Sequence, residues 1–251
     1  MCSSDLNLPP RLLIRSLDST DFRVLPSEVA AWPFWSPDNN SIAYSSGGNK
    51  LKVVDTRGVS SYSLADIANM RGVAWTPERT LIYSNAGTGK AQMWEVPVAG
   101  GTPKLVLASD LDTRFPTLLP DGRHILFTSA ISGETAGIYL GSRNRNDAEN
   151  ATPRKLLPDV SMARVVPAIE GHDLILLFVR QSNLVGVRMD GRSYALVGEV
   201  FPIAEGVSSV STAAHYLFSA SQTGTLVYVH GADFGKNTFT DRKSTRLNSS
   251  H

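Results

Sequence analysis

A turn followed by a short apolar run recurs along the chain, and this repeat restricts the fold more than any other feature. The first copy reads F-W-S-P-D-N-N-S-I-A-Y from Phe34 to Tyr44. Later copies lie at 75–83, 118–127, 169–178 and 219–228. Their turn positions are separated by 40, 43, 51 and 50 residues and are Pro37, Pro77, Pro120, Gly171 and Ser221. A period of this length is typical of a β-propeller or another repeat array.

The residues of the repeat suit a tight turn between two strands. Proline presets φ for the second turn position, aspartate bonds the backbone just after it, and glycine or asparagine tolerates a positive φ. A β-prone run then reaches an aromatic residue that we expect in the core: Tyr44, Tyr83, Phe127, Phe178 and Tyr228. A second proline precedes the turn by four residues in three copies, at Pro33, Pro116 and Pro167. The last two copies lack Pro-Asp, so there the repeat is inferred.

Each repeat has room for four short strands, which predicts an all-β fold: a truncated β-propeller of four-stranded blades. About five blades are expected, with the first and last incomplete. Two short outer strands are expected within 11–27, and the last module begins near Ser211. A β-sandwich is the alternative, although a sandwich need not repeat its own turn. No convincing helical periodicity is present, and residues 63–70 are the best helical candidate, at one turn or two. The later strands of the whole modules are expected at 51–55, 59–64, 92–96, 104–107, 137–142, 154–157, 184–188 and 195–197.

The two ends of the chain do not resemble the rest. Met1–Leu6 reads M-C-S-S-D-L and Asp241–His251 reads D-R-K-S-T-R-L-N-S-S-H. Both resemble translations of common sequencing adapters. We therefore expect residues 1–6 and 241–251 to be adapter artefacts, and residues 7–240 to be a partial propeller domain from a longer reading frame. A disordered polar tail is the alternative interpretation.

Charge and cysteine content argue against several classes of function. The chain has 24 basic and 23 acidic residues, and the adapter-like ends hold Arg242, Lys243, Arg246, Asp5 and Asp241, which leaves 21 of each. A neutral domain lacks the electrostatic footprint of a nucleic-acid or anionic-membrane partner. The single cysteine lies in the adapter-like start, so no disulfide or thiol chemistry is predicted, as suits an exported domain. The sequence contains no run of about 18 apolar residues, so it predicts no membrane span.

One stretch invites a phosphate-binding interpretation. Ala86–Lys90 reads A-G-T-G-K. A phosphate loop requires G-x-x-x-x-G-K-[ST] between a strand and a helix. Here Ala91 takes the place of the hydroxyl residue, and the next element is predicted to be a strand. A hairpin turn is therefore the favoured interpretation.

Other polar and aromatic residues have structural explanations that are stronger than functional ones. Asp38 and Asp121 follow turn prolines and suit an Asx-type turn better than a cation or amine site. Trp35, Trp75 and Trp94 suit the blade core better than a stacking platform. Outside the adapter-like ends, which hold His251, the four histidines show no zinc-ligand spacing, and His124 and His172 are expected on the surface. These four are His124, His172, His215 and His230.

The repeat resembles the WD-repeat-like blades of TolB-type propellers, whose signature is W-S-P-D-G-x-x-I-A-F. Residues 11–230 more specifically resemble the propeller that follows the kinase domain and membrane helix of many bacterial eukaryotic-like serine/threonine protein kinases. Two departures are a turn one residue shorter at Trp75–Thr80 and the loss of Pro-Asp at Gly171. The matching pieces are R-S-L-D-S at 15–19, P-F-W-S-P-D at 33–38, L-P-D-G-R-H-I-L-F at 119–127, G-I-Y-L-G-S at 137–142 and G-E-V-F-P-I-A-E at 198–205.

This resemblance implies a non-catalytic sensing or protein-interaction segment of a six-bladed type, on the extracytoplasmic (periplasmic) side of a bacterial membrane and tethered by an upstream helix. The kinase motifs themselves do not occur in the sequence, so no enzyme activity is expected of this segment. A protein or small envelope ligand is the expected partner. No catalytic, cofactor or metal residue is predicted, and no binding residue is specified. The alternatives are a free TolB-like periplasmic scaffold and a propeller appended to a hydrolase, although no G-x-S-x-G motif is present.

Overall fold

The computed structural model describes residues 11–16, 18–26, 29–87, 89–107, 109–144, 146, 152–169, 171–210 and 214–231. The two adapter-like ends lie outside these ranges. Within them the fold is almost entirely β-structure, with a single 3-10 turn, η1 (Gly133–Thr135). None of the helical structure in the described ranges is long and apolar enough to span a membrane.

Four sheets each contain four antiparallel strands in sequence order. The first sheet holds β3 (Ala30–Trp35), β4 (Ser41–Ser46), β5 (Lys50–Asp55) and β6 (Ser61–Asp66). The second holds β7 (Met70–Trp75), β8 (Thr80–Asn85), β9 (Gln92–Pro97) and β10 (Lys104–Leu107). The third holds β11 (Thr113–Leu118), β12 (His124–Ser129), β13 (Gly137–Ser142) and β14 (Arg154–Leu157). The fourth holds β15 (Arg164–Pro167), β16 (Leu174–Arg180), β17 (Asn183–Met189) and β18 (Leu196–Ala204).

Shorter strands precede and follow these four sheets. β1 (Leu13–Ile14) pairs with β2 (Arg23–Val24), as predicted for the start of the chain. After the fourth sheet, β19 (Ser209–Val210) pairs with β20 (His215–Tyr216), and β21 (Phe218–Ala220) pairs with β22 (Leu226–Tyr228). We call β19–β22 the last strand group. Its predicted beginning at Ser211 lies outside the described residues.

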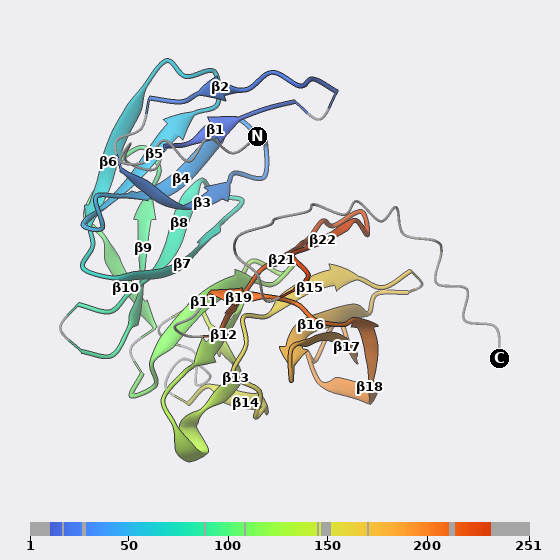
Figure 1. Cartoon of the computed structure of the whole chain (residues 1–251). Helices are drawn as coiled ribbons and strands as arrows, with labels where there is room; N and C mark the ends of the chain where they lie inside the picture. The colour runs from blue at the N-terminus through green and yellow to red at the C-terminus, as the bar shows by residue number, and fades with distance from the viewer. Residues whose placement is uncertain are drawn as a thin grey trace.

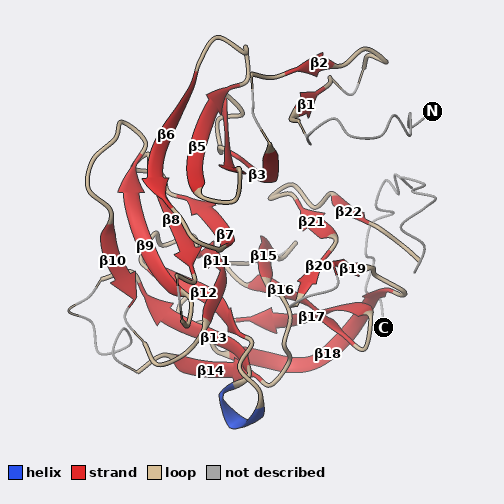
Figure 2. Cartoon of the chain, turned by 60° about the vertical axis from the view of Figure 1, so that its left-hand side comes forward, coloured by secondary structure: helices blue, strands red, loops and turns tan. Residues whose placement is uncertain are grey.

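The sheets follow one another around an arc, with the first strand of each sheet toward the middle (Figure 2). β3, β7, β11 and β15 are these inner strands, and β6, β10, β14 and β18 lie at the outside. Neighbouring inner strands contact each other from β3 to β7, from β7 to β11 and from β15 to β21. Figure 1 likewise shows β15 and β21 side by side. Residues from several sheets therefore meet at the inner strands.

The repeated turn has the same hydrogen bond in all five copies, including the last two, which lack the turn proline. The N–H group of the residue that precedes the turn donates to the carbonyl oxygen four or five residues later, at 2.8–3.0 Å. The residue three positions after that donor always has a positive φ: Asn39, Arg79, Gly122, Gly171 and Gly224. The turn at 76–80 is one residue shorter than the turn at 36–41, as the sequence predicted. Backbone geometry has thus preserved the repeat where its residues changed.

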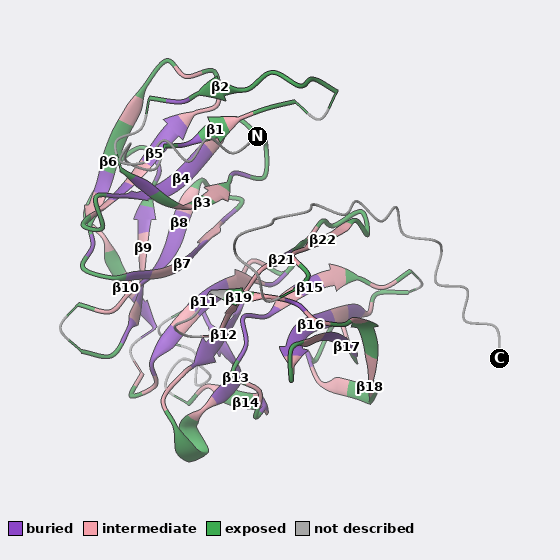
Figure 3. Ribbon diagram, in the orientation of Figure 1, coloured by how far each residue is buried: buried purple, intermediate pink, exposed green. Residues whose placement is uncertain are grey.

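The core lies between neighbouring sheets, and the middle strands supply most of it (Figure 3). β4, β12 and β13 are buried along nearly their whole length, whereas β6 and β18 are largely exposed. Four of the five predicted core aromatics are at most 2% exposed, and Tyr228 is half-buried. Removing a large side chain of this kind from water contributes roughly 1.5–3 kcal/mol.

The helical candidate at 63–70 is not a helix. Residues 63–66 belong to the edge strand β6, and Met70 begins β7. β6 pairs with β5 from Ser61 to Asp66, and Leu64 and Met70 are buried against a shared apolar cluster. Pairing with β5 thus satisfies the backbone groups that a helical turn would have satisfied internally.

Candidate functional site

The inner strands depart from regular β-geometry at corresponding positions. In β3, β7 and β11 the strand register shifts between the first and last pairs. In each strand one residue has a positive φ, four positions before the residue whose N–H makes the turn hydrogen bond. The φ values are 58° at Trp32, 116° at Gly72 and 52° at Phe115. A positive φ is rare for large side chains and indicates that the surrounding structure imposes the conformation. Such bulges redirect side chains and are frequent beside functional sites.

Gly72 shows how closely two inner strands approach each other. A Cβ atom at this position would lie 2.9 Å from Phe115 Cα and 3.1 Å from Pro116 Cδ. Its φ of 116° is also a conformation that L side chains rarely adopt. A glycine at this position therefore permits the contact between β7 and β11.

Three aromatic rings from distant parts of the chain meet at the inner strands. The Trp32 ring of the first sheet lies 4.5 Å from the His215 ring of β20 and 6.4 Å from the Phe115 ring of the third sheet. The Phe115 and His215 rings stack at 5.6 Å. His215 Nδ1 is buried and has no hydrogen-bond partner in the part of the chain that the structure describes. Burial, and then the charge of Arg164, lower the pKa of His215, which favours its neutral form.

Three of the inner strands each carry an arginine. Arg71 lies on β7, Arg114 on β11 and Arg164 on β15. Arg114 binds Asp112, with 2.6 Å between Arg114 Nε and Asp112 Oδ2. Arg71 Nε is buried without a hydrogen-bond partner among the described residues. Burial and the neighbouring charge of Arg114 lower the pKa of Arg71.

Arg164 is held by neutral groups alone within the described ranges. Its Nη1 donates to Thr117 Oγ1 at 2.7 Å and to the Ala163 carbonyl oxygen at 3.0 Å. The Thr117 hydroxyl in turn donates to the same carbonyl at 2.8 Å. Desolvation lowers the pKa of Arg164 to about 10, so the guanidinium remains charged at neutral pH. We call Trp32, Arg71, Arg114, Phe115, Arg164 and His215 the inner-strand cluster.

The two aspartates that follow turn prolines form Asx-type turns, as predicted. Asp38 Oδ1 accepts the Asn40 N–H at 3.1 Å and the Ser36 hydroxyl at 2.6 Å. Asp121 Oδ1 accepts the backbone N–H groups of Arg123 and His124, each at 3.0 Å. These bonds account for both carboxylates without a bound cation.

The surface prediction for His124 is wrong, because this side chain joins two sheets. It is 13% exposed, its Nδ1 lies 2.5 Å from Asp121 Oδ2, and its ring contacts the Tyr194 ring of the fourth sheet edge-on at 5.0 Å. Burial, and then the charge and hydrogen bond of Asp121, raise the pKa of Tyr194 to about 12. His172 is exposed as predicted, and exposed His230 pairs with the Glu205 carbonyl oxygen at 2.9 Å.

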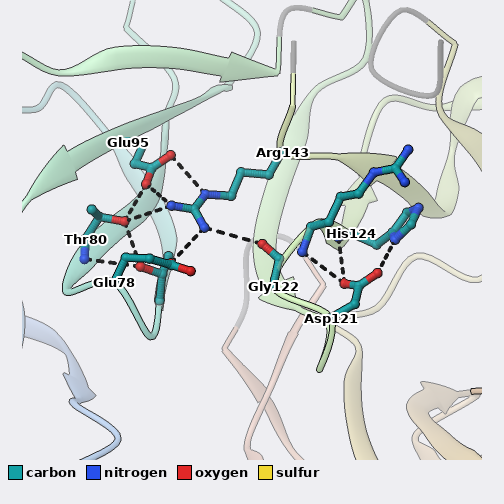
Figure 4. Close-up of polar contacts among 9 residues, drawn as sticks. Glu78, Thr80, Glu95, Asp121, Gly122, His124 and Arg143 are labelled. Atoms are coloured by element: carbon teal, nitrogen blue, oxygen red, sulfur yellow. Dashed lines mark hydrogen bonds and ion pairs between the residues drawn. The ribbon is translucent and has the colours of Figure 1, made fainter. Parts of the chain in front are cut away.

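A polar cluster beside Asp121 joins the second and third sheets (Figure 4). Arg143, just after β13, reaches Glu95 Oε1 at 2.5 Å from Nη2 and Glu95 Oε2 at 3.1 Å from Nε. Its Nη1 reaches Glu78 Oε2 at 2.9 Å and the Gly122 carbonyl oxygen at 3.3 Å. Every donor has a protein acceptor, so this cluster is explained as a contact between sheets.

The tryptophans divide between core and surface. Trp75 and Trp94 pack against a buried cluster, and Trp75 Nε1 donates to the Phe34 carbonyl oxygen at 3.1 Å. The core prediction is wrong for Trp35, which is 49% exposed. It lines an open groove of about 590 Å³ with Ile14, Phe22 and Arg57, between the β1–β2 hairpin and the first sheet.

The loop at 86–90 is the predicted hairpin turn and not a phosphate loop. The Gly89 N–H donates to the Ala86 carbonyl oxygen at 3.0 Å, and the turn joins β8 to β9, which is a strand. In the described ranges, no group of three or more His, Cys, Asp or Glu side chains is placed to bind a metal ion. The inner-strand cluster is therefore the candidate functional site. Sequence reasoning missed its arginines, because each is a single residue without a motif.

Several solved structures share this arrangement of sheets. TolB from Acinetobacter baumannii matches with a TM-score of 0.63 at 18% identity, over 91% of this chain and 56% of that one. A putative TolB from Agrobacterium tumefaciens matches with a TM-score of 0.59 at 18% identity, over 90% of this chain and 76% of that one. The tricorn protease matches at 0.59 and 8% identity, over 84% of this chain and 25% of that one.

The fold is therefore that of a TolB-like β-propeller region, all-β and built from four-stranded antiparallel sheets. The chain spans 56% of the length of the Acinetobacter TolB that it matches. No protein-family model and no curated protein matches its sequence.

Proposed function

We propose that this chain is a non-catalytic sensing or protein-interaction segment of a bacterial β-propeller. The observation that carries the proposal is the inner-strand cluster, where side chains from four sequence-distant strands meet with polar atoms left unpaired. A propeller brings many short strands to one axis, which suits recognition, and its fold does not itself specify chemistry. The TolB-like arrangement of the sheets supports the same conclusion.

In this proposal the four four-stranded sheets are whole propeller blades, while β1–β2 and the last strand group belong to two incomplete blades. The parent is a membrane-anchored serine/threonine protein kinase with a propeller of six blades. The kinase link rests on the sequence pieces at 15–19, 33–38, 119–127, 137–142 and 198–205. The same link places the segment on the extracytoplasmic side of the membrane, tethered by an upstream helix. Its partner is then a protein or a small ligand of the cell envelope.

A second candidate is a propeller attached to a hydrolase. It is favoured by the likeness to the tricorn protease and to a structure titled puromycin hydrolase, which matches with a TM-score of 0.51 at 12% identity over 83% of this chain and 35% of that one. A free TolB-like scaffold is the third candidate, supported by the two TolB structures.

Long-read sequencing of the source DNA through both ends of this frame distinguishes the candidates. The kinase proposal expects an upstream frame with one apolar helix preceded by a kinase domain, and further blades after residue 240. A hydrolase domain in the same frame would overturn it in favour of the second candidate. A frame with a signal peptide alone would indicate the free scaffold.

A further inference from the structure

Three arginine side chains in the described part of this protein present the Nε–Nη2 edge of the guanidinium to a carboxylate. Arg180 places Nε and Nη2 each 2.8 Å from the two oxygens of Asp159. Arg57 places the same atoms 3.0 and 2.8 Å from Asp55, and Arg143 places them 3.1 and 2.5 Å from Glu95. This two-point geometry is the preferred way in which arginine binds an oxyanion.

The Nε–Nη2 edge of the Arg164 guanidinium has no hydrogen-bond partner among the described residues. Its Nη1 alone is engaged, by the Thr117 hydroxyl and the Ala163 carbonyl oxygen. Within the described ranges no acceptor contacts its Nε or Nη2, and no carboxylate neutralises its charge. Arg164 is half-buried, and burial lowers its pKa, whereas the charge of Arg180 is paired with Asp159. A desolvated cation without a counter-charge is costly, which makes an added anion favourable.

Neighbouring groups would favour the same kind of ligand. Buried His215 Nδ1 also lacks a partner in the described part of the chain, and His215 is close enough to Arg164 for their charges to interact. Phe115 and Trp32 limit the access of water to His215. Low local polarity strengthens the attraction of an anion to these groups.

We propose that the Nε–Nη2 edge of Arg164, with His215 beside it, binds a small oxyanion, either a carboxylate or a phosphate group. This inference deepens the proposed function by naming the ligand chemistry of the inner-strand cluster. The fixed Thr117 hydroxyl orients the guanidinium, so Thr117 is a positioning residue and not a ligand.

The test is an NMR titration of the whole chain that follows the arginine Nε–H and histidine ring signals. Sodium acetate and sodium phosphate are the two probes, and sodium chloride holds the ionic strength constant. The proposal expects saturable shifts of Arg164 and His215 with at least one probe, and the probe that saturates identifies carboxylate or phosphate. It also expects the bound anion to raise the apparent pKa of His215, because the imidazolium gains a counter-charge.

Two variants separate binding from folding. Arg164→Lys retains the positive charge but loses the two-point edge, so we expect it to weaken binding about tenfold or more while the protein stays folded. Arg180→Lys is the matched control, because the Arg180 edge is already occupied by Asp159, and it should leave the titration unchanged.

Non-saturating shifts that sodium chloride reproduces would overturn the anion site, as would equal binding by folded Arg164→Lys. The sequencing result and this titration are independent. A frame without a kinase domain would overturn the kinase proposal and leave the anion site intact, and failure of the titration would leave the kinase proposal intact.

Discussion

At the residue scale, a few backbone positions determine how the inner strands meet. Trp32, Gly72 and Phe115 hold corresponding places in three sheets, and each has a positive φ. A left-handed conformation costs an L residue roughly 1–2 kcal/mol, so packing around the two aromatic residues must offset it. Of these three positions, Gly72 is the one where neighbouring atoms leave no room for a side chain.

Gly72→Ala should lower the free energy of unfolding by about 2–4 kcal/mol, because the new methyl group meets the Phe115 backbone and the residue keeps an unfavourable φ. Urea denaturation followed by circular dichroism measures this. Gly89→Ala is the control, since Gly89 has open space around its Cβ position and no positive φ. It should change stability by no more than about 0.5 kcal/mol. Equal effects of the two changes would contradict the close approach of β7 and β11.

At the element scale, the sequence predicted strands and turns well because their causes are local. Proline, aspartate and glycine determine the turns within a few residues, and β13, β14 and β10 have the predicted bounds. The helical candidate at 63–70 is not a helix, because pairing with β5 overrides a weak local preference. The prediction that Trp35 lies in the core failed for a related reason. Its exposure depends on the position of the β1–β2 hairpin, which the residues around Trp35 do not determine.

The contact between the second and third sheets depends on Arg143. Arg143→Met should lower stability at pH 7 by about 1–3 kcal/mol, because half-buried Glu95 loses its counter-charge. Chemical denaturation measures the difference. Glu78→Gln is the matched control and should change stability by less than about 0.5 kcal/mol, because the Glu78 side chain is 57% exposed.

The Arg143→Met deficit should also depend on pH. Burial raises the pKa of Glu95, but the hydrogen bonds and charge of Arg143, together with Thr80, outweigh burial and lower it overall. In the wild type, Glu95 therefore contributes stability that is present at neutral pH and lost as pH falls through its lowered pKa. In Arg143→Met burial remains while the Arg143 contribution is lost, so the folded variant gains relative stability once Glu95 is protonated. The deficit should shrink as pH falls through the ordinary glutamate pKa of about 4.3, and a deficit independent of pH would exclude Glu95 as its cause.

At the scale of the whole molecule, the sequence could not predict which side chains meet at the inner strands. The arginines and His215 lie on separate strands, and no spacing in the chain relates them. Only the order of the sheets around the arc brings them together (Figure 2). The sequence could predict that a repeat would place its first strands inside, but not which side chains would remain there without partners.

Trp32 links the first sheet to the last strand group across more than 180 positions of sequence. Trp32→Ala should therefore speed amide hydrogen exchange in His215–Ala220 and at the start of β11, because the ring that covers His215 and Phe115 is lost. Exchange in the buried centre of β12 and β13 should change little. Trp35→Ala is the control on the same strand, since Trp35 is 49% exposed and should leave exchange in His215–Ala220 unchanged. If Trp32→Ala changed exchange in the first sheet alone, the aromatic contact would not hold the last strand group in place. The inner-strand cluster would then lack the fixed His215 on which an anion site depends.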